Sequence, residues 1–236
     1  MKFASFFSLL ALSTPTWARM GGCPNGSEKV VINFDRLPDG TPTAAGEMVY
    51  DQWKEYGVIF SGRRKSHEGE RFVNKEALRL FDSSHPTGGD FNLGSPNEKC
   101  HPCKHSSGPC PGVGESGKPS NCANQNKVLI IDQKGMDHKD PDAAEWGGEI
   151  IATFTVAPRK ILGFSVMDVV AHTDSYWEIL TPSGHQKETG PLPETGENGF
   201  AVANLNFQHG NIGSIRFEVD QEFALTHLRF CMPIEH

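Results

Sequence analysis

The sequence predicts an all-β protein: a two-sheet antiparallel β-sandwich, jelly-roll-like, with a long disulfide-stapled loop. Short apolar segments rich in β-branched residues recur along the chain, and in many of them apolar and polar residues alternate. Turn-forming residues separate the segments, and the chain contains 25 Gly and 16 Pro. No segment has the pattern of a long amphipathic helix, so the predicted strands must bury their apolar faces against one another as packed sheets.

Ten segments are predicted strands on this basis: Val30–Phe34, Gly57–Ser61, Ala77–Phe81, Lys127–Asp132, Glu149–Val156, Lys160–Val169, Tyr176–Thr181, Gly199–Phe207, Ile212–Val219 and Ala224–Phe230. Ala44–Tyr56 is a predicted short helix, because its apolar residues follow a helical spacing that ends at Gly57. Residues 82–126 show almost no periodicity. A structureless segment of that length is typical of a functional loop, and its cysteines would pin it to the surface.

The first 18 residues predict a secretory leader: Lys2, the apolar run Phe3–Leu12 and a small residue at Ala18. No later segment reaches the length of a membrane-spanning helix. We therefore expect a secreted, extracellular protein without membrane insertion, in which residues 19–236 form one sandwich domain. Its cysteines would meet an oxidising environment.

Six cysteines follow the leader, and an even number in a secreted chain predicts three disulfides among fifteen possible pairings. The simplest arrangement is a terminal clasp, Cys23–Cys231, with two local bridges among Cys100, Cys103, Cys110 and Cys122. The close spacing of those four, with His101 and His105 nearby, also fits a zinc site. Oxidation outside the cell favours disulfides over zinc.

The formal net charge of −7 argues against nucleic acid and anionic lipid as partners, because both require basic patches. Neutral sugars and divalent cations remain compatible with it. Asn25-Gly26-Ser27 is a glycosylation sequon, so Asn25 is a candidate glycan site.

Several segments share a pattern with exported β-sandwich proteins. They are Val31–Thr41, Tyr56–Ser61, Pro86–Gly94 and Leu225–Phe230. In this order, and spread over residues 29–231, they resemble the galactose-binding-like jelly rolls, the architecture of several carbohydrate-binding modules. The resemblance implies a sandwich that binds without catalysis and often holds a structural calcium ion. His227 departs from it, because calcium-bearing members often carry an acid at this place.

Calcium prefers oxygen ligands on turns that can wrap the ion. The turn at Pro86–Gly94 offers bare carbonyls with Asp90 and Asn92, and we add Asp142 and Asp35 as further candidate ligands. The alternative is a solvated acidic loop with Asx-turns.

Trp146, Tyr176 and Trp177 lie at predicted loop–strand junctions and are candidate sugar-stacking residues. The alternative is that these rings fill the core, as large aromatic side chains usually do. Asp168, at the end of an apolar strand and close in sequence to Asp174 and Glu178, could instead be the acid of a glycoside hydrolase. The alternative for Asp168 is a strand-end carboxylate bonded to a loop amide.

The sequence therefore predicts a non-catalytic binding module for extracellular carbohydrate or a matrix polymer, stabilised by calcium. A hydrolase on the same fold and a structural coat or adhesion protein are the alternatives.

Overall fold

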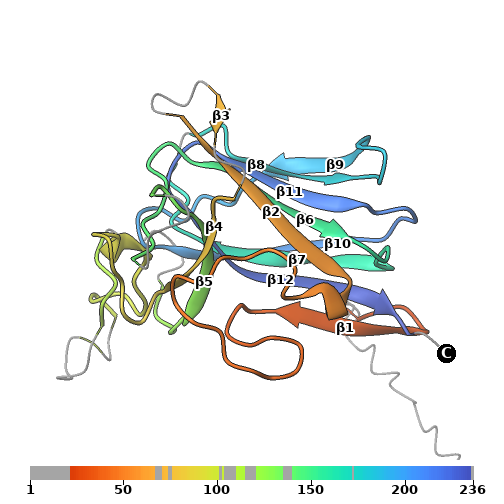
Figure 1. Cartoon of the computed structure of the whole chain (residues 1–236), viewed down its shortest axis with the longest axis horizontal. Coiled ribbons are helices and arrows are strands. Elements are labelled where there is room, and N and C mark those ends of the chain that lie inside the picture. Colours follow the sequence, from red (N-terminus) through yellow and green to blue (C-terminus); the bar gives the residue numbers. More distant parts are fainter. Residues whose placement is uncertain are drawn as a thin grey trace, which may run out of the picture.

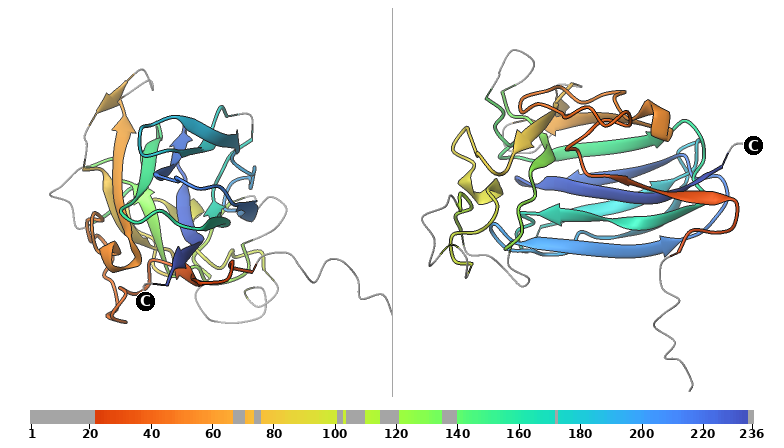
Figure 2. Two further views of the ribbon diagram at one scale, coloured as in Figure 1. Left: turned by 90° about the vertical axis from the view of Figure 1, so that its right-hand side faces the viewer. Right: turned by 90° about the horizontal axis from the view of Figure 1, so that it is seen from below.

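A computed structural model describes residues 22–66, 71–73, 76–100, 103, 110–114, 121–134, 140–171 and 173–234. The predicted leader, residues 1–18, lies outside the described residues, as does part of the cysteine-rich segment. The described chain forms two antiparallel sheets packed face to face (Figures 1 and 2). The predicted β-sandwich is thus confirmed.

The first sheet has the strand order β10 (Phe200–Phe207), β7 (Lys160–Met167), β12 (Ala224–Pro233), β5 (Lys127–Ile131) and β4 (Leu78–Asp82), and β1 (Ser27–Ile32) also pairs with β12. The second sheet has the order β3 (Phe72–Val73), β2 (Val58–Lys65), β6 (Gly148–Phe154), β11 (Ser214–Val219), β8 (Tyr176–Leu180) and β9 (Gln186–Pro191). Two short 3-10 turns, η2 (Lys54–Tyr56) and η4 (Phe91–Leu93), lie outside the sheets.

Each of the ten predicted strands has a counterpart, and two strands are additional. β9 reads Gln-Lys-Glu-Thr-Gly-Pro and is largely exposed at the edge of the second sheet, so it carries no apolar face for a pattern to reveal. β3 has only two residues. Edge position and shortness explain why sequence periodicity misses both strands.

The predicted helix over Ala44–Tyr56 is wrong except for the single turn η2. The rest of the segment is irregular, with turns and bends, and bonds to β4 and β2: Val49 N–H donates to Leu78 O, and Phe60 N–H donates to Tyr50 O. These backbone bonds replace the internal bonds of a helix. Two apolar residues of the segment, Val49 and Trp53, are instead buried in the core.

The core lies between the sheets and follows the alternation of the strands. Phe34, Trp53 and Phe60 meet edge to face, with ring centroids 5.3 to 5.8 Å apart. All three are almost fully buried. Such contacts add to the stabilisation that burial of large rings provides.

The opposite, outward face of the second sheet carries a row of ion pairs. Arg63 Nε lies 2.6 Å from Glu149 Oε1, and Arg216 Nε lies 2.6 Å from Glu178 Oε1. Arg216 Nη1 also lies 3.7 Å from Glu149 Oε2. Glu149 is only 1% exposed, so this row buries charge as well as pairing it.

All three disulfides are present, and the Cys23–Cys231 clasp is confirmed. The clasp joins the chain before β1 to β12 and closes a loop of 208 residues, worth about 5 kcal/mol on loop entropy as an upper figure. Cys100–Cys122 and Cys103–Cys110 are the two local bridges. With every cysteine oxidised, no thiolate is left for the zinc alternative.

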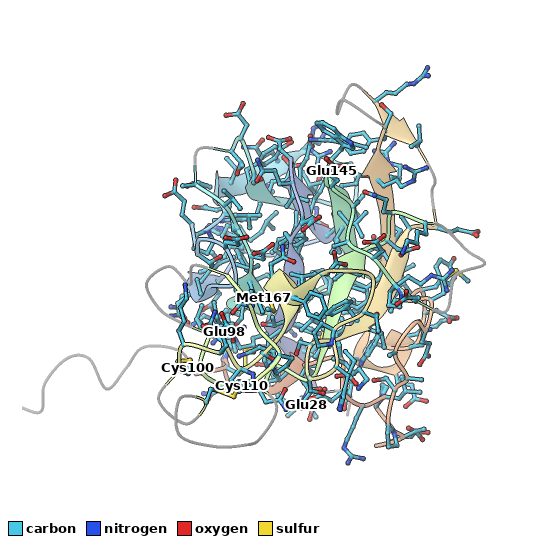
Figure 3. The ribbon with its side chains drawn as sticks, turned by 90° about the vertical axis from the view of Figure 1, so that its left-hand side faces the viewer. Glu28, Glu98, Cys100, Cys110, Glu145 and Met167 are labelled. Carbon is cyan, nitrogen blue, oxygen red and sulfur yellow. A yellow bond between two sulfur atoms is a disulfide. The ribbon has the colours of Figure 1, made fainter. Side chains whose placement is uncertain are left out.

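The cysteine-rich segment packs onto one end of the sandwich, which Figure 3 views directly, with Cys100, Cys110 and Met167 labelled. Ser95 N–H donates to Ser83 O and Asn97 N–H donates to Asn121 O, so the described parts of the segment bond to one another. At the opposite end, Asn25 is exposed in a turn before β1. The described residues contain no helix with the length and apolar character needed to cross a membrane.

Candidate functional site

Three loops meet at the cysteine-rich end of the sandwich and bring polar residues together. Asp168 follows β7, Glu222 precedes β12, and Asn92 lies in η4. Asp168 has a φ of 63°, and the neighbouring Asn198 has a φ of 59°. Asp and Asn adopt a left-handed backbone more readily than other residues except glycine, so both fit the tight loops that place them here.

Asn92 joins two carboxylates. Its side-chain nitrogen donates to Asp168 Oδ2 and to Glu222 Oε2, at 2.8 Å in each case. Since both oxygens bond to the same nitrogen atom, they lie no farther apart than twice this distance. The three residues come from positions 76 and 130 apart in sequence, and the fold alone makes them neighbours.

A buried network of asparagine amides holds Asp168 and Asn92 in place. Asn198 N–H donates to Asp168 Oδ1 at 2.7 Å, and the Asn198 side chain donates to Asn92 O at 2.6 Å and Gly94 O at 2.7 Å. Asn97 in turn donates to Asn198 Oδ1 at 2.6 Å. Asn97 and Asn198 are fully buried. Satisfied buried networks of this kind rigidify a site, so Asp168 and Asn92 are held in one arrangement.

A second carboxylate pair lies beside the first. Asp90, which is 5% exposed, accepts a 2.6 Å hydrogen bond from Ala143 N–H, and its carboxyl faces that of Asp142. Asp142 is paired with Lys134 Nζ at 2.9 Å. Glu222 acts electrostatically on Asp90, and Asp142 acts on Glu222, so the two pairs form one acidic cluster.

The charges of this cluster are unfavourably placed. Burial raises the pKa of Asp168 to about 7, with repulsion from Glu222 and Glu197 adding to the effect. Burial likewise raises the pKa of Asp90 to about 7 and raises the pKa of Glu222. Such a cluster can hold a proton near neutral pH, accept hydrogen bonds from hydroxyls, or attract a cation.

The cluster opens into a pocket of about 520 Å³, hereafter the acidic pocket. Half-buried Trp146 forms one wall, and Glu145, labelled in Figure 3, lies at the rim. The other lining residues are Asn92, Asp168, Val170, Glu197, Asp220, Gln221 and Glu222. Asp220 also pairs with Lys65, so the pocket borders the charged face of the second sheet.

The predicted calcium ligands divide between two places. Asp90, Asn92 and Asp142 lie in or beside the acidic cluster, whereas Asp35 accepts hydrogen bonds from Lys127 N–H and Asn126. Asp35 therefore lies at the start of β5, whereas Asp90 bonds to Ala143, which pairs with Asp132 just beyond the other end of that strand. Within the described parts of the chain, no three acidic, histidine or cysteine side chains converge as metal ligands.

The predicted stacking residues also separate. Trp146 lines the acidic pocket, but Trp177 is 8% exposed and packs in the core against Phe164. Tyr176 lies on the outward face of the second sheet, where its hydroxyl donates to Glu218 and accepts from Arg216. Neighbouring strand residues point to opposite faces, which is why Tyr176 and Trp177 cannot share one platform.

Glu222, Glu197 and Asn198 are site residues that the sequence analysis misses. All three lie in short polar loops without a recognisable motif, and their only signal is position next to a predicted strand end. Of the residues considered for hydrolysis, Asp168 lies in the pocket, whereas Glu178 pairs with Arg216 on the outward sheet face.

No protein-family model matches the chain, and a search of curated proteins finds no match either.

Proposed function

We propose that this protein is a secreted, non-catalytic binding module for extracellular carbohydrate, and that the acidic pocket holds the sugar. The observation that carries the proposal is the union of Trp146 with the Asp168–Asn92–Glu222 arrangement in one open pocket. An indole face packs against the C–H face of a sugar ring, and carboxylates accept hydrogen bonds from its hydroxyls.

The acidic lining selects among polymers. Glu145, Glu197 and Asp220 add negative charge to the pocket, so a sulfated or carboxylated polymer would be repelled. A neutral polysaccharide would not. The pocket volume of about 520 Å³ accommodates one or two sugar rings of such a chain.

Calcium belongs to the proposal as a stabilising cation of the acidic cluster. The donors are of the right kind, because calcium prefers carboxylate oxygens. Asp90 and Asp142 with Glu222 would hold it, and the ion would have to draw these side chains together. The expected result is a rise in melting temperature with millimolar calcium that chelator reverses and that Asp90→Asn abolishes. An equal rise in the melting temperature of Asp90→Asn with calcium would contradict calcium binding at this cluster.

Binding is tested by calorimetry and by pull-down on insoluble neutral polysaccharides. Trp146→Ala is expected to weaken binding at least ten-fold. Tyr50→Ala is the matched control, since Tyr50 is an aromatic side chain 59% exposed on another part of the surface. Equal binding by the wild type and Trp146→Ala would contradict the proposed site, and no binding to any neutral polymer would favour a structural or adhesive role.

One observation favours a second candidate, a glycoside hydrolase. Asp168 and Glu222 lie as close as the paired carboxyls of retaining enzymes, which are about 5 Å apart. Protonated Asp168 could give its proton to the glycosidic oxygen while Glu222 attacks the sugar, once the substrate has displaced Asn92 from between the two carboxyls. Release of reducing ends by the wild type, lost in Asp168→Asn and Glu222→Gln, would establish hydrolysis. No release from polymers that the protein binds would leave binding alone.

A further inference from the structure

A second hollow region lies at the other end of the sandwich, away from the acidic pocket. β7 separates the two, because Arg159 precedes this strand and Asp168 follows it. Two hollows of about 430 Å³ and 720 Å³ adjoin there, and Gln208 and His209 line both. We call the combined feature the polar groove. Trp177 and Glu188 lie at one end of it, and Asn25 and Arg159 at the other.

Three side-chain amides in the lining of the polar groove are free to bind a ligand. Asn206, Gln208 and Asn211 are exposed, and within the described part of the chain their side chains make no hydrogen bond. Each amide therefore offers an unused acceptor and two unused donors. Hydroxyl groups, which both donate and accept, are the natural complement of such a surface.

The His209 ring supplies an aromatic plane beside these amides. The exposed ring of His209 lies 4.9 Å from the ring of Phe207, which is 8% exposed. Phe207 thus supports His209 from the core side. Backbone geometry aids the display: the pairing of β10 with β7 shifts register between Asn204 and Phe207, and bulges of this kind re-aim side chains.

The polar groove is close to neutral, in contrast to the acidic pocket. Glu188 and Arg159 contribute one charge of each sign, in different hollows. A polyanion would find too little positive charge here, and a purely apolar ligand would leave the amides unpaired. An uncharged, hydroxyl-rich chain fits both constraints.

We propose that the polar groove binds an uncharged carbohydrate chain, with Gln208 and His209 at its centre. The bound carbohydrate could be either a glycan attached to this protein or a separate polymer. Asn25 lines the groove, is exposed in the turn closed by the Ser27 N–H to Pro24 O bond, and belongs to a sequon, so a glycan on Asn25 would begin inside the groove. The other source is an external polymer. Binding of an external polymer rests on the proposed carbohydrate-binding function, but it takes place in the polar groove and not in the acidic pocket.

The first arm of the test uses protein without the Asn25 glycan and measures whether added oligosaccharides bind to the polar groove. Isotope-labelled Asn25→Gln protein is titrated with hexasaccharides of cellulose, chitin and β-1,3-glucan. The side-chain amide signals of Asn206, Gln208 and Asn211 are expected to shift and saturate. His209→Ala in this background should weaken binding at least ten-fold, whereas Lys187→Ala, on exposed β9 outside the groove, should not change it.

The second arm tests the attached glycan. Protein from a eukaryotic secretory host is expected to lose mass on treatment with N-glycanase, and the Asn25→Gln variant should not. If the glycan lies in the polar groove, His209→Ala lowers the melting temperature of the glycosylated protein but leaves that of the Asn25→Gln protein unchanged. An equal effect of His209→Ala in both forms shows that the glycan does not contact the groove.

A positive result in either arm supports the proposal and identifies the source. Absence of amide shifts in the first arm, together with absence of glycan coupling in the second, overturns it. Trp146→Ala separates this outcome from failure of the proposed function, because that variant alters the acidic pocket and is expected to leave both arms unchanged.

Discussion

The raised pKa of Asp90 predicts an unusual pH dependence of stability. Asp90 is buried at 5% exposure, and desolvation raises its pKa from 3.8 to about 7. The unfolded chain releases this proton near pH 4, whereas the folded protein retains it until about pH 7. The stability associated with Asp90 is therefore complete below pH 4, falls between pH 4 and pH 7, and is lost above pH 7.

The magnitude follows from the two pKa values. At about 1.4 kcal/mol per pH unit, the difference corresponds to roughly 4 kcal/mol between pH 4 and pH 8, as an upper figure. Asp90→Asn should remove this loss. The amide oxygen can accept the bond from Ala143 N–H, and the amide nitrogen can donate to Asp142, as protonated Asp90 does.

The assay is urea unfolding of the wild type and Asp90→Asn in calcium-free buffer between pH 4.5 and pH 8, followed by tryptophan fluorescence, so that no bound cation competes with the proton on Asp90. The difference between the two proteins isolates Asp90 from the other titrating groups. It should be small at pH 4.5 and should favour the variant by a few kcal/mol at pH 8. Asp51→Asn, which removes an exposed carboxylate elsewhere, should show no such slope. A wild-type-to-Asp90→Asn difference that is the same at both pH values would refute the reasoning.

Three further predictions concern stability. Replacing Cys23 and Cys231 together by Ser should lower the free energy of unfolding by up to about 5 kcal/mol, as chemical denaturation would measure. Glu149→Ala should cost about 1.5 to 3 kcal/mol, because it removes the charged hydrogen-bond partner of Arg63, while Arg216 keeps its pair with Glu178. Gly163→Ala should prevent stable folding, since its φ is 146° and the added Cβ would lie 1.9 Å from Ala203 O.

Each of these predictions has a contradicting outcome. An unchanged unfolding midpoint in the double Cys→Ser variant would show that the clasp does not restrain the unfolded chain. If Glu149→Ala lowers the free energy of unfolding by less than about 1 kcal/mol, the ion pairs of Glu149 contribute no more than ordinary surface ion pairs. Wild-type stability of Gly163→Ala would mean that β7 and β10 can separate at no cost. Gly184→Ala is a control for local space, because nothing lies near its added Cβ.

Sequence periodicity predicts most of the fold because strand formation depends on local alternation. The strand Ile212–Val219 is an example: its alternation predicts the buried Phe217 and outward Arg216 that the structure contains. The Cys23–Cys231 pairing follows from position, since the sandwich brings the two ends together at β1 and β12. β9 could not be predicted, because pairing with β8 rather than an apolar face stabilises it.

The candidate site is only partly predictable. Trp146, Asp90, Asn92 and Asp142 could be singled out by residue type, and the structure places them in or beside the acidic pocket. Trp177 carried the same kind of signal and lies in the core instead. Residue type specifies what a side chain can do, but burial depends on which face of the strand it occupies.

The order of apolar and polar residues, read alone, determined that this chain forms short strands and that those strands pack as sheets, and the even number of cysteines indicated that they pair. Only the tertiary structure decided that Asn92 stands between Asp168 and Glu222. The physical reason is that strand formation depends on neighbours in sequence, whereas a site built from loops depends on how the sheets stack. The raised pKa values of Asp90 and Asp168 have the same origin, because burial and crowding of charge arise only when those loops pack together.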